Sequence, residues 1–426
     1  MASMKRLLMT IALVLGLTML PSAGAFAATQ AELEAKIKAM EQTLNQMKAE
    51  LGQVRQQQQQ QQQAVQAAAT SKLPAWAERI TFFGDVRFRY EHTTYDETTL
   101  DGVPTSKSDK DRFRVRLRFG ARSQINEDVE LGMRMTLGSD DDPTSTNVTM
   151  GNYFGEYTTW GIDEAYVKWT PSLVPDKAFT FSFGKVPQPF VTTKVIWDSD
   201  VVPEGAFINY TFNKGGDWRP FINASFMTVN QPGDWSSNDY APAAQAGIKG
   251  RAGAFSLVGT AGYTAWGNLG DPGDLPPNLH GTPTYTENGE TRTTNYQVWD
   301  VFAQAAFKFS PKGSVGMWGQ YVQNADSSGP YQDKDSGYGV AGFVTYDKFK
   351  FLVLYKDVEA NATPGFIADS DSGYVNRKGW QLEGEYQMWK YGKLQVTYYN
   401  TEPDDANIPG ATNKSQTIFV NTIFKF

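Results

Sequence analysis

The chain has 426 residues, two histidines, no cysteine and a formal net charge of −7 at pH 7. The negative charge argues against nucleic-acid binding, because nucleic-acid-binding domains carry basic surfaces. The lack of cysteine fits export through an oxidising compartment, although many cytosolic domains also lack it. Beyond the first residues, no apolar run is long enough for a spanning helix. A membrane-embedded mature chain would therefore have to form a closed β-barrel.

The first 27 residues have the pattern of a secretory signal peptide. Lys5 and Arg6 precede an apolar run from Leu7 to Leu20, which is too short to span a bilayer. Ala25-Phe26-Ala27 provides small residues flanking a cleavage site. We therefore expect residues 1–27 to be removed during export.

Residues 28–70 form a separate segment with a heptad repeat. Apolar residues recur at alternating spacings of four and three, which indicates a coiled-coil helix; they are Leu33, Ile37, Met40, Leu44, Met47, Leu51 and Val54. A glutamine run, Gln56 to Gln63, follows, and Val65 and Ala68 beyond it fall on the same register, so the helix is expected to continue through the run. The alternative interpretation is a low-complexity spacer. Residues 71–79, which include Pro74, are expected to form a linker, and the segment 28–70 is expected to lie in the periplasm.

Residues 111–119 define the character of the rest of the chain. Arginine alternates with Phe, Val, Leu and Phe through this stretch, so that an extended strand would have one basic face and one apolar face. A strand between lipid and a water-filled lumen satisfies both faces. The stretch therefore predicts the wall of a transmembrane β-barrel.

Similar alternation continues to the end of the chain. It predicts an all-β, antiparallel transmembrane barrel of about sixteen strands over residues 80–426. The strands are expected near residues 80–92, 111–125, 128–138, 159–170, 178–186, 205–212, 217–229, 243–251, 253–266, 294–309, 313–325, 336–347, 348–358, 374–388, 390–401 and 415–426. Short and long connections alternate, as expected for periplasmic turns and extracellular loops.

The last strand carries a family resemblance. It reads Thr417-Ile-Phe-Val-Asn-Thr-Ile-Phe-Lys-Phe426 and ends the chain on phenylalanine. With the signal segment and the alternating strands, this ending resembles Gram-negative porins, and the added N-terminal coiled coil is similar to the putative-porin group. The basic early strands resemble, more distantly, phosphate-selective porins. The resemblance implies an outer-membrane location and recognition of Phe426 by the barrel-assembly machinery.

Strand parity assigns a set of charged residues to the lumen. These candidate pore-lining residues are Arg87, Arg89, Arg112, Arg114, Arg116, Arg118, Arg134, Glu130, Glu164, Lys168, Asp300, Glu383 and Glu385. Arginines on neighbouring strands would form a basic wall that attracts anions. The alternative is an ion-pair lattice, in which carboxylates such as Asp85 and Glu91 neutralise the arginines and stiffen the wall.

The third long connection, residues 186–205, is the candidate constriction loop. In porins this loop folds inward and narrows the pore. Its prolines and its apolar residues, among them Phe190 and Ile196, distinguish it from a freely solvated loop. Its charged residues could face the basic wall; they are Lys194, Asp198, Asp200 and Glu204. Alternatively, the segment is a surface loop that packs against a neighbouring subunit.

Signals of metal binding and catalysis are weak. Acidic clusters at 140–142, 333–335 and 369–371 lack the spacing of a calcium loop, so we interpret them as solvated charge and expect no metal. No hydrolase, zinc, phosphate-loop or dinucleotide motif is present. A barrel hydrolase using His92 is a remote alternative. We expect neither an enzyme nor a cofactor.

The sequence therefore predicts passive diffusion of small hydrophilic solutes or ions through a porin, with mild anion preference. We expect outer-membrane lipid and small hydrophilic or anionic solutes as partners, a homotrimer as the assembly, and no nucleic acid. Two alternatives remain open. The barrel could tether the envelope through its coil, or it could sheathe a periplasmic partner such as an electron carrier.

Overall fold

The computed structural model describes residues 30–70, 77–138, 142–151, 159–230, 239–267, 269, 275 and 278–426. The predicted signal peptide, residues 1–27, and linker residues 71–76 lie outside the described residues. The chain divides into two compact units, Met1–Ala75 and Trp76–Phe426. Each unit is described by itself.

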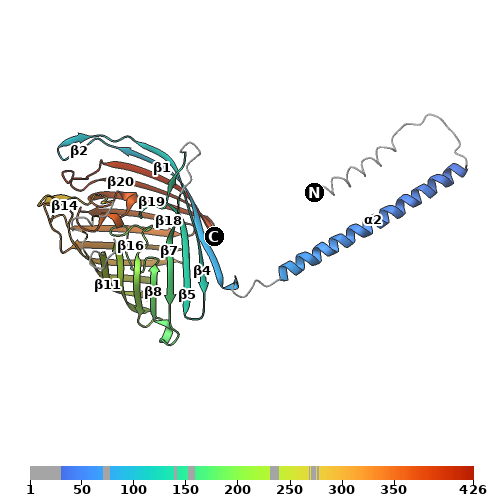
Figure 1. Cartoon of the computed structure of the whole chain (residues 1–426), viewed down its shortest axis with the longest axis horizontal. Coiled ribbons are helices and arrows are strands. Elements are labelled where there is room, and N and C mark those ends of the chain that lie inside the picture. The colour runs from blue at the N-terminus through green and yellow to red at the C-terminus, as the bar shows by residue number, and fades with distance from the viewer. Residues whose placement is uncertain are drawn as a thin grey trace. The chain divides into compact units, whose positions relative to one another are not determined.

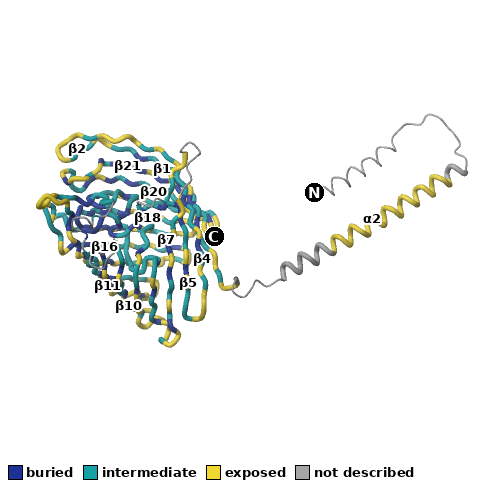
Figure 2. The backbone as a smooth tube through the Cα atoms, in the orientation of Figure 1, coloured by how far each residue is buried: buried dark blue, intermediate teal, exposed yellow. Residues whose placement is uncertain are grey.

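The first unit contains the helix α2, Gln30–Thr70, of 41 residues (Figure 1). It covers the predicted coiled-coil segment and continues through the glutamine run. Much of α2 is coloured as exposed in Figure 2. The exposed residues of the single chain include the apolar heptad residues Ile37, Met40, Leu44, Met47, Leu51 and Val54. Neither α2 nor any other described helix meets the length and hydropathy needed to cross a bilayer. Association of α2 with other helices stays a prediction.

The second unit is built from strands. The long strands are β1 (Ile80–Tyr95), β4 (Lys110–Gln124), β5 (Val129–Gly138), β7 (Thr159–Trp169), β8 (Phe179–Lys185), β9 (Glu204–Thr211), β10 (Trp218–Asn230), β11 (Asp239–Ala252), β12 (Phe255–Trp266), β15 (Tyr296–Ser310), β16 (Gly313–Asn324), β17 (Ser336–Tyr346), β18 (Phe349–Val358), β19 (Arg377–Trp389), β20 (Gly392–Pro403) and β21 (Ser415–Lys425). The short elements are η1 (Ala77–Arg79), β2 (Thr98–Leu100), β3 (Val103–Thr105), β6 (Val148–Thr149), η2 (Pro175–Lys177), β13 (Tyr285–Glu287), β14 (Glu290–Arg292), η3 (Gly365–Ile367) and η4 (Ser370–Ser372).

The long strands close into a barrel. Each pairs antiparallel with the next along the chain, and β21 returns to pair with β1, for example Val86 with Phe424. The described residues therefore form a closed barrel of sixteen strands, with the two-residue β6 added against β4. The predicted fold class is confirmed. Strand boundaries differ by a few residues, most at β11, which begins at Asp239 rather than at residue 243.

Alternation gives the barrel two faces. Phe113 is 63% exposed on the outer face, whereas Arg116 on the same strand is 7% exposed and points inward. Similar outward apolar side chains continue round the barrel and suit contact with lipid; among them are Phe88, Leu131, Met133, Ile162, Ile222, Leu257, Val301, Met317, Val340, Phe351, Leu382 and Ile418. The inward face is polar over β1 and β4.

Connections at one end of the barrel are short, and their chemistry fits tight turns. The Asn126 side-chain oxygen accepts hydrogen bonds of 2.9 Å from the backbone N–H groups of Asp128 and Val129, which closes the β4–β5 turn. Gly253 has a φ of 61° in the β11–β12 turn, a conformation that glycine adopts without steric cost. Long connections lie at the opposite end, which faces outward in bacterial outer-membrane barrels.

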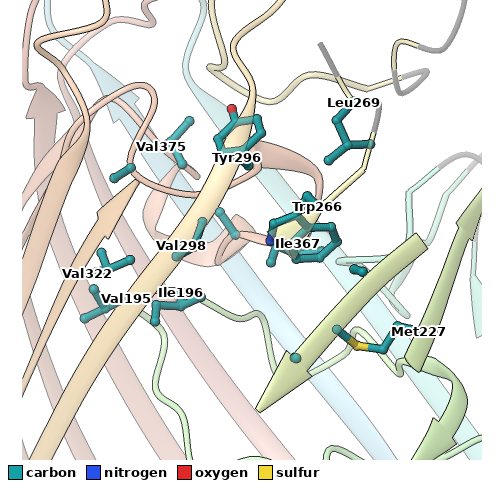
Figure 3. Close-up of a cluster of buried hydrophobic side chains, with 14 of the residues drawn as sticks. Val195, Ile196, Met227, Trp266, Leu269, Tyr296, Val298, Val322, Ile367 and Val375 are labelled. Carbon is teal, nitrogen blue, oxygen red and sulfur yellow. The ribbon is translucent and has the colours of Figure 1, made fainter. Parts of the chain in front are cut away.

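Two long connections fold into the barrel interior. Residues 186–203, between β8 and β9, contribute Val195 and Ile196 to a buried apolar cluster. Residues 359–376, between β18 and β19, contribute Ile367 and Val375 to the same cluster (Figure 3). These segments are named the third loop and the inner loop. They pack against inward apolar side chains of the strands, among them Met227, Tyr296, Val298 and Val322.

The chain terminus completes the closure. The backbone N–H of Phe426 donates to the Gly84 carbonyl at 3.2 Å, and the Gly84 N–H donates to the Phe426 carbonyl at 3.1 Å. The Phe426 ring covers the bare backbone of Gly84, where a Cβ would lie 2.6 Å from the ring. The ring also lies 6.2 Å from that of Phe119. Phe426 therefore joins the last strand to the first.

We expect Phe426→Ala to lower the yield of folded, heat-modifiable barrel in the outer membrane, because it removes the ring over Gly84 and the predicted assembly signal. Phe426→Tyr is the control, since it retains the ring. Folded yield is measured by the gel-mobility difference between heated and unheated samples. Equal yields of the Ala variant and the unaltered protein would contradict a role for Phe426 in assembly.

Candidate functional site

A row of arginines lines the inner face of β1 and β4. The antiparallel register places Arg87 opposite Arg116 and Arg89 opposite Arg114. Like charges directly opposite each other on a sheet destabilise it unless carboxylates intervene. We name this row the basic wall; it consists of Arg87, Arg89, Arg112, Arg114, Arg116 and Arg118.

Carboxylates on β1 itself neutralise part of the positive charge of the basic wall. Asp85 lies 2.7 Å from both Arg116 and Arg118. Glu91 lies 2.6 Å from Arg112 and 3.5 Å from Arg114. Each carboxylate therefore accepts from two guanidinium groups, which suits the acceptor capacity of an ionised carboxylate.

The two infolded loops bring further carboxylates against the wall. Asp200 of the third loop lies 3.3 Å from Arg116 and 3.5 Å from Arg118. Asp371 of the inner loop lies 2.9 Å from Arg89. Burial opposes ionisation of both aspartates, yet the neighbouring cations hold the pKa of each below its ordinary value. Both loops are thus held to the wall by ion pairs.

A second group of charges joins the two loops to each other. Lys194 lies 3.2 Å from Asp369 and 3.8 Å from Asp371. Burial opposes protonation of Lys194, but these carboxylates hold its pKa well above the ordinary value. Asp198 accepts hydrogen bonds from the backbone N–H of Ser370 at 2.9 Å and from its hydroxyl at 3.0 Å. Burial, followed by repulsion from Asp369, raises the pKa of Asp198 to about 8.

Some buried cations have no carboxylate within salt-bridge distance among the described residues. Arg87 donates from Nη2 to the Asn147 side-chain oxygen at 2.5 Å, and its Nε has no hydrogen bond. Lys356, on the inner face of β18, is only 3% exposed and is likewise without a carboxylate partner. The carboxylates near the wall therefore leave part of its positive charge uncompensated.

The remaining predicted residues on β5 and β7 lie in local ion pairs. Arg134 contacts Asp163 at 2.7 Å and Glu164 at 2.6 Å. Lys168 contacts Glu130 at 2.8 Å. Neighbouring residues 163 and 164 both reach Arg134 because the β5–β7 register shifts at this point. Parity alone did not identify Asp163.

The other predicted acidic residues, on β15 and β19, lie apart from the basic wall. Asp300 lies over the bare backbone of its register partner Gly262. Glu383 contacts Lys350 at 3.5 Å, and Glu385 contacts Lys393 at 2.9 Å. All three residues face inward. Glu383 and Glu385 are paired locally, and among the described residues none of the three forms an ion pair with the basic wall.

The prediction for Glu204 is wrong in two respects. Glu204 is the first residue of β9 rather than part of the loop, which ends at Pro203. Its side chain is exposed and pairs at 2.5 Å with Lys185, its register partner on β8. It therefore does not face the arginines. Lys194, Asp198 and Asp200 do lie inside the barrel with the third loop.

The inner loop was not predicted from sequence. Asp369-Ser-Asp371 was interpreted as solvated charge, but Asp369 is buried and caps η4 by accepting from the Ser372 N–H at 3.1 Å. A sequence signal existed in the apolar residues nearby, since Phe366 and Ile367 are unusual for a solvated loop. Across the described part of the chain, no group of acidic and histidine side chains is arranged to hold a metal ion.

Comparison with known proteins places the chain in a family. The family model described as putative porin matches residues 19–105 and 96–253, more than half of the chain. OmpF of Salmonella typhi, solved in complex with daunomycin, superposes with a TM-score of 0.50 at 10% identity, over 82% of this chain and 97% of that chain. This likeness shows a shared fold.

A triple mutant of Rhodopseudomonas blastica porin gives a TM-score of 0.45 at 14% identity, over 82% of this chain and 100% of that chain. No curated protein matches the chain. The family match covers β1 to β11 and includes both strands of the basic wall. The chain therefore belongs to the putative-porin family and is an outer-membrane β-barrel channel.

Proposed function

We propose that this channel passes small hydrophilic solutes and ions by passive diffusion, with a mild preference for anions. The observation that carries the proposal is that the two infolded loops fill one side of the barrel interior and leave polar cavities on the other. The apolar cluster packs the third loop and the inner loop against inward side chains of β10, β15 and β16. The basic wall, which lies on other strands, borders one of these cavities.

One cavity lies beside the basic wall, and a second cavity adjoins the first. The first, of about 450 Å³, is lined in part by Arg112, Arg114 and Asp371. The other, of about 260 Å³, is lined in part by Thr146, Asp163 and Asp200. Residues 142 and 145 border both cavities. Solutes passing along this route would meet guanidinium groups on one side and loop aspartates on the other.

The balance of positive and negative side chains along this route favours a weak rather than a strong preference for anions over cations. Most wall arginines have a carboxylate partner, but Arg87 has none among the described residues, and Asp85 and Glu91 are each shared by two arginines. At 0.1 M salt the Debye length is about 10 Å, so the remaining positive field acts across a narrowed pore. The preference should therefore be greatest at low salt.

A liposome-swelling assay with uncharged sugars tests the diffusion proposal. Proteoliposomes should swell at rates that fall as the sugar becomes larger, because passage is limited by pore width. Protein-free liposomes and liposomes containing heat-denatured protein are the controls. Swelling no faster than in the controls would contradict diffusion and would favour a barrel that tethers the envelope or sheathes a periplasmic partner.

We further propose that α2 joins three copies of the chain. The exposed apolar heptad positions support this proposal, since a helix with such a stripe buries it against like helices. The occupant we propose is therefore a second and a third copy of the same helix. Helix pairing would then reinforce any contact between barrels.

Trimers in detergent should be weakened or abolished by the combined substitutions Ile37→Asp, Leu44→Asp and Leu51→Asp. Each substitution places a charge at the same core position of successive heptads of the predicted coil. Deleting residues 28–70 should have the same effect. The matched control is Gln42→Asp, Gln46→Asp and Gln53→Asp, which adds three charges at positions outside the apolar stripe. Light scattering measures the molar mass. Trimers that persist in the triple apolar variant would show that the barrels hold each other without the coil.

A further inference from the structure

The cavity of about 450 Å³ lies at the end of the barrel that carries the long connections. It is bordered by the ends of β1, β4, β19, β20 and β21 and by residues of the adjoining loops. We name it the outer cavity. Five of its lining residues are cationic: Lys107, Lys110, Arg112, Arg114 and Arg377.

Arg377 is the most unusual of these cations, because it is only 3% exposed and contacts neutral oxygens alone. Its Nη1 donates to the Thr412 carbonyl at 3.0 Å, and its Nη2 donates to the hydroxyls of Thr401 at 3.0 Å and Ser415 at 2.7 Å. Its Nε has no hydrogen-bond partner. Among the described residues no carboxylate lies within salt-bridge distance of it. Burying a charge in this way is unfavourable unless an anion compensates it.

The Nε edge of Arg377 lies against Gly373. A Cβ at residue 373 would lie 2.8 Å from Nε, and both residues line the outer cavity. Nε itself is buried. The guanidinium is therefore fixed by its two terminal nitrogens, and it contributes a positive charge to the wall of the cavity.

Two lysines lie against one aromatic ring at the same cavity. The Nζ atoms of Lys107 and Lys110 are 4.9 Å and 5.7 Å from the centre of the Tyr95 ring. Neither lysine has a carboxylate within salt-bridge distance among the described residues. The cation–π contact leaves their N–H groups free to bind other acceptors.

The acidic residues that line the outer cavity are engaged elsewhere. Glu91 is shared by Arg112 and Arg114. Asp371 binds Arg89, and Asp142 accepts hydrogen bonds from the backbone N–H and the hydroxyl of Thr144. The three residues Lys107, Lys110 and Arg377 thus remain without carboxylate partners around one polar cavity.

We propose that the outer cavity is a binding site for small oxyanions that carry two or more acidic oxygens, such as phosphate, phosphate monoesters or dicarboxylates. The two lysines would donate to the oxygens of the anion, in charge-assisted hydrogen bonds that are among the stronger ones in proteins. The buried positive charge of Arg377 would attract the anion to the cavity. The inference rests on the proposed function only in that solutes reach the cavity from the channel mouth. Binding there would raise the local concentration of such anions before they pass the basic wall.

Isothermal titration calorimetry on the detergent-solubilised full chain tests this site. Sodium phosphate and sodium succinate are titrated separately, with sodium chloride of equal ionic strength as the reference, so that the phosphate and dicarboxylate classes are distinguished. We expect saturable binding of at least one of the two. Arg377→Gln and, separately, Lys107→Gln with Lys110→Gln should each weaken that binding by about tenfold or more, as expected for loss of a charged group that attracts or binds the anion.

Lys348→Gln is the matched control, because Lys348 is an exposed lysine in the β17–β18 turn, between strand ends that do not line the outer cavity. It should leave binding unchanged. If Arg377→Gln fails to give a heat-modifiable barrel, the lysine pair decides the question, since neither lysine side chain forms a hydrogen bond within the described part of the chain. Binding that is unchanged in the lysine variant, or that is no different from chloride in the unaltered protein, would overturn the proposal. If the protein passes sugars but binds no anion, the proposed site is wrong and the proposed diffusion function stands. If the protein binds the anion but passes no sugars, the diffusion function is wrong and the site stands.

Discussion

A single aspartate in place of Val195 is expected to raise the single-channel conductance several-fold. Val195 is 1% exposed in the apolar cluster that holds the third loop inside the barrel. Its Cγ2 lies against the bare backbone of Gly339, where a Cβ would be 2.4 Å away. An ionised carboxylate buried here without a partner would cost several kcal/mol. The loop should therefore leave the strands and widen the pore.

Val202→Asp is the matched control for this prediction. It introduces the same charge into the same loop, but Val202 is only partly buried, lines two cavities and is not a member of the apolar cluster. Its conductance should stay close to that of the unaltered protein. Heat-modifiability on gels checks that both variants form barrels. A folded Val195→Asp barrel of unchanged conductance would contradict the view that apolar packing of the third loop restricts the pore.

The second large effect concerns ion selectivity. Arg114→Gln with Arg116→Gln should shift the reversal potential in a salt gradient towards cations. Removing the two guanidinium groups would leave Glu91 with Arg112 alone, while Asp85 and Asp200 would share Arg118. The wall would lose two positive charges while its carboxylates remain, and the shift should increase as salt is lowered.

Lys249→Gln with Arg251→Gln provides the control for lost net charge. Both residues are exposed at the short-connection end of β11, away from the basic wall. This pair should leave the reversal potential near that of the unaltered protein. Equal shifts in the two double variants would mean that overall charge, rather than the wall, sets selectivity. No shift in the Arg114 and Arg116 variant would mean that these arginines act only as structural ion pairs.

The barrel could be predicted because its signals are local. A period of two in hydrophobicity specifies a two-faced strand, as in residues 111–119, and Asn126 or Gly253 marks a turn by its own backbone preference. The same parity placed the arginines of β1 and β4 on the inner face. Neither inference requires knowledge of distant residues.

The ion pairs could not be predicted in the same way. Arg89 and Asp371 are 282 positions apart, and only the closed barrel together with the infolded inner loop brings them within 2.9 Å. Glu204 illustrates the opposite error, since the strand begins one residue earlier than predicted and pairs this side chain with Lys185. Strand ends are fixed by pairing with neighbours, as with Lys185, rather than by local sequence.

If the barrel is an open channel whose route follows the basic wall, the unaltered protein should conduct and should prefer anions. The most direct test is the zero-current potential of the unaltered protein in planar bilayers, measured across a tenfold salt gradient with the dilute side below 0.1 M. We expect discrete conductance steps and a zero-current potential whose sign indicates mild anion preference. The size of this potential should decrease when both salt concentrations are raised while their ratio is kept at ten. A protein that does not conduct, or one that is cation-selective at low salt, would contradict an open route along the basic wall.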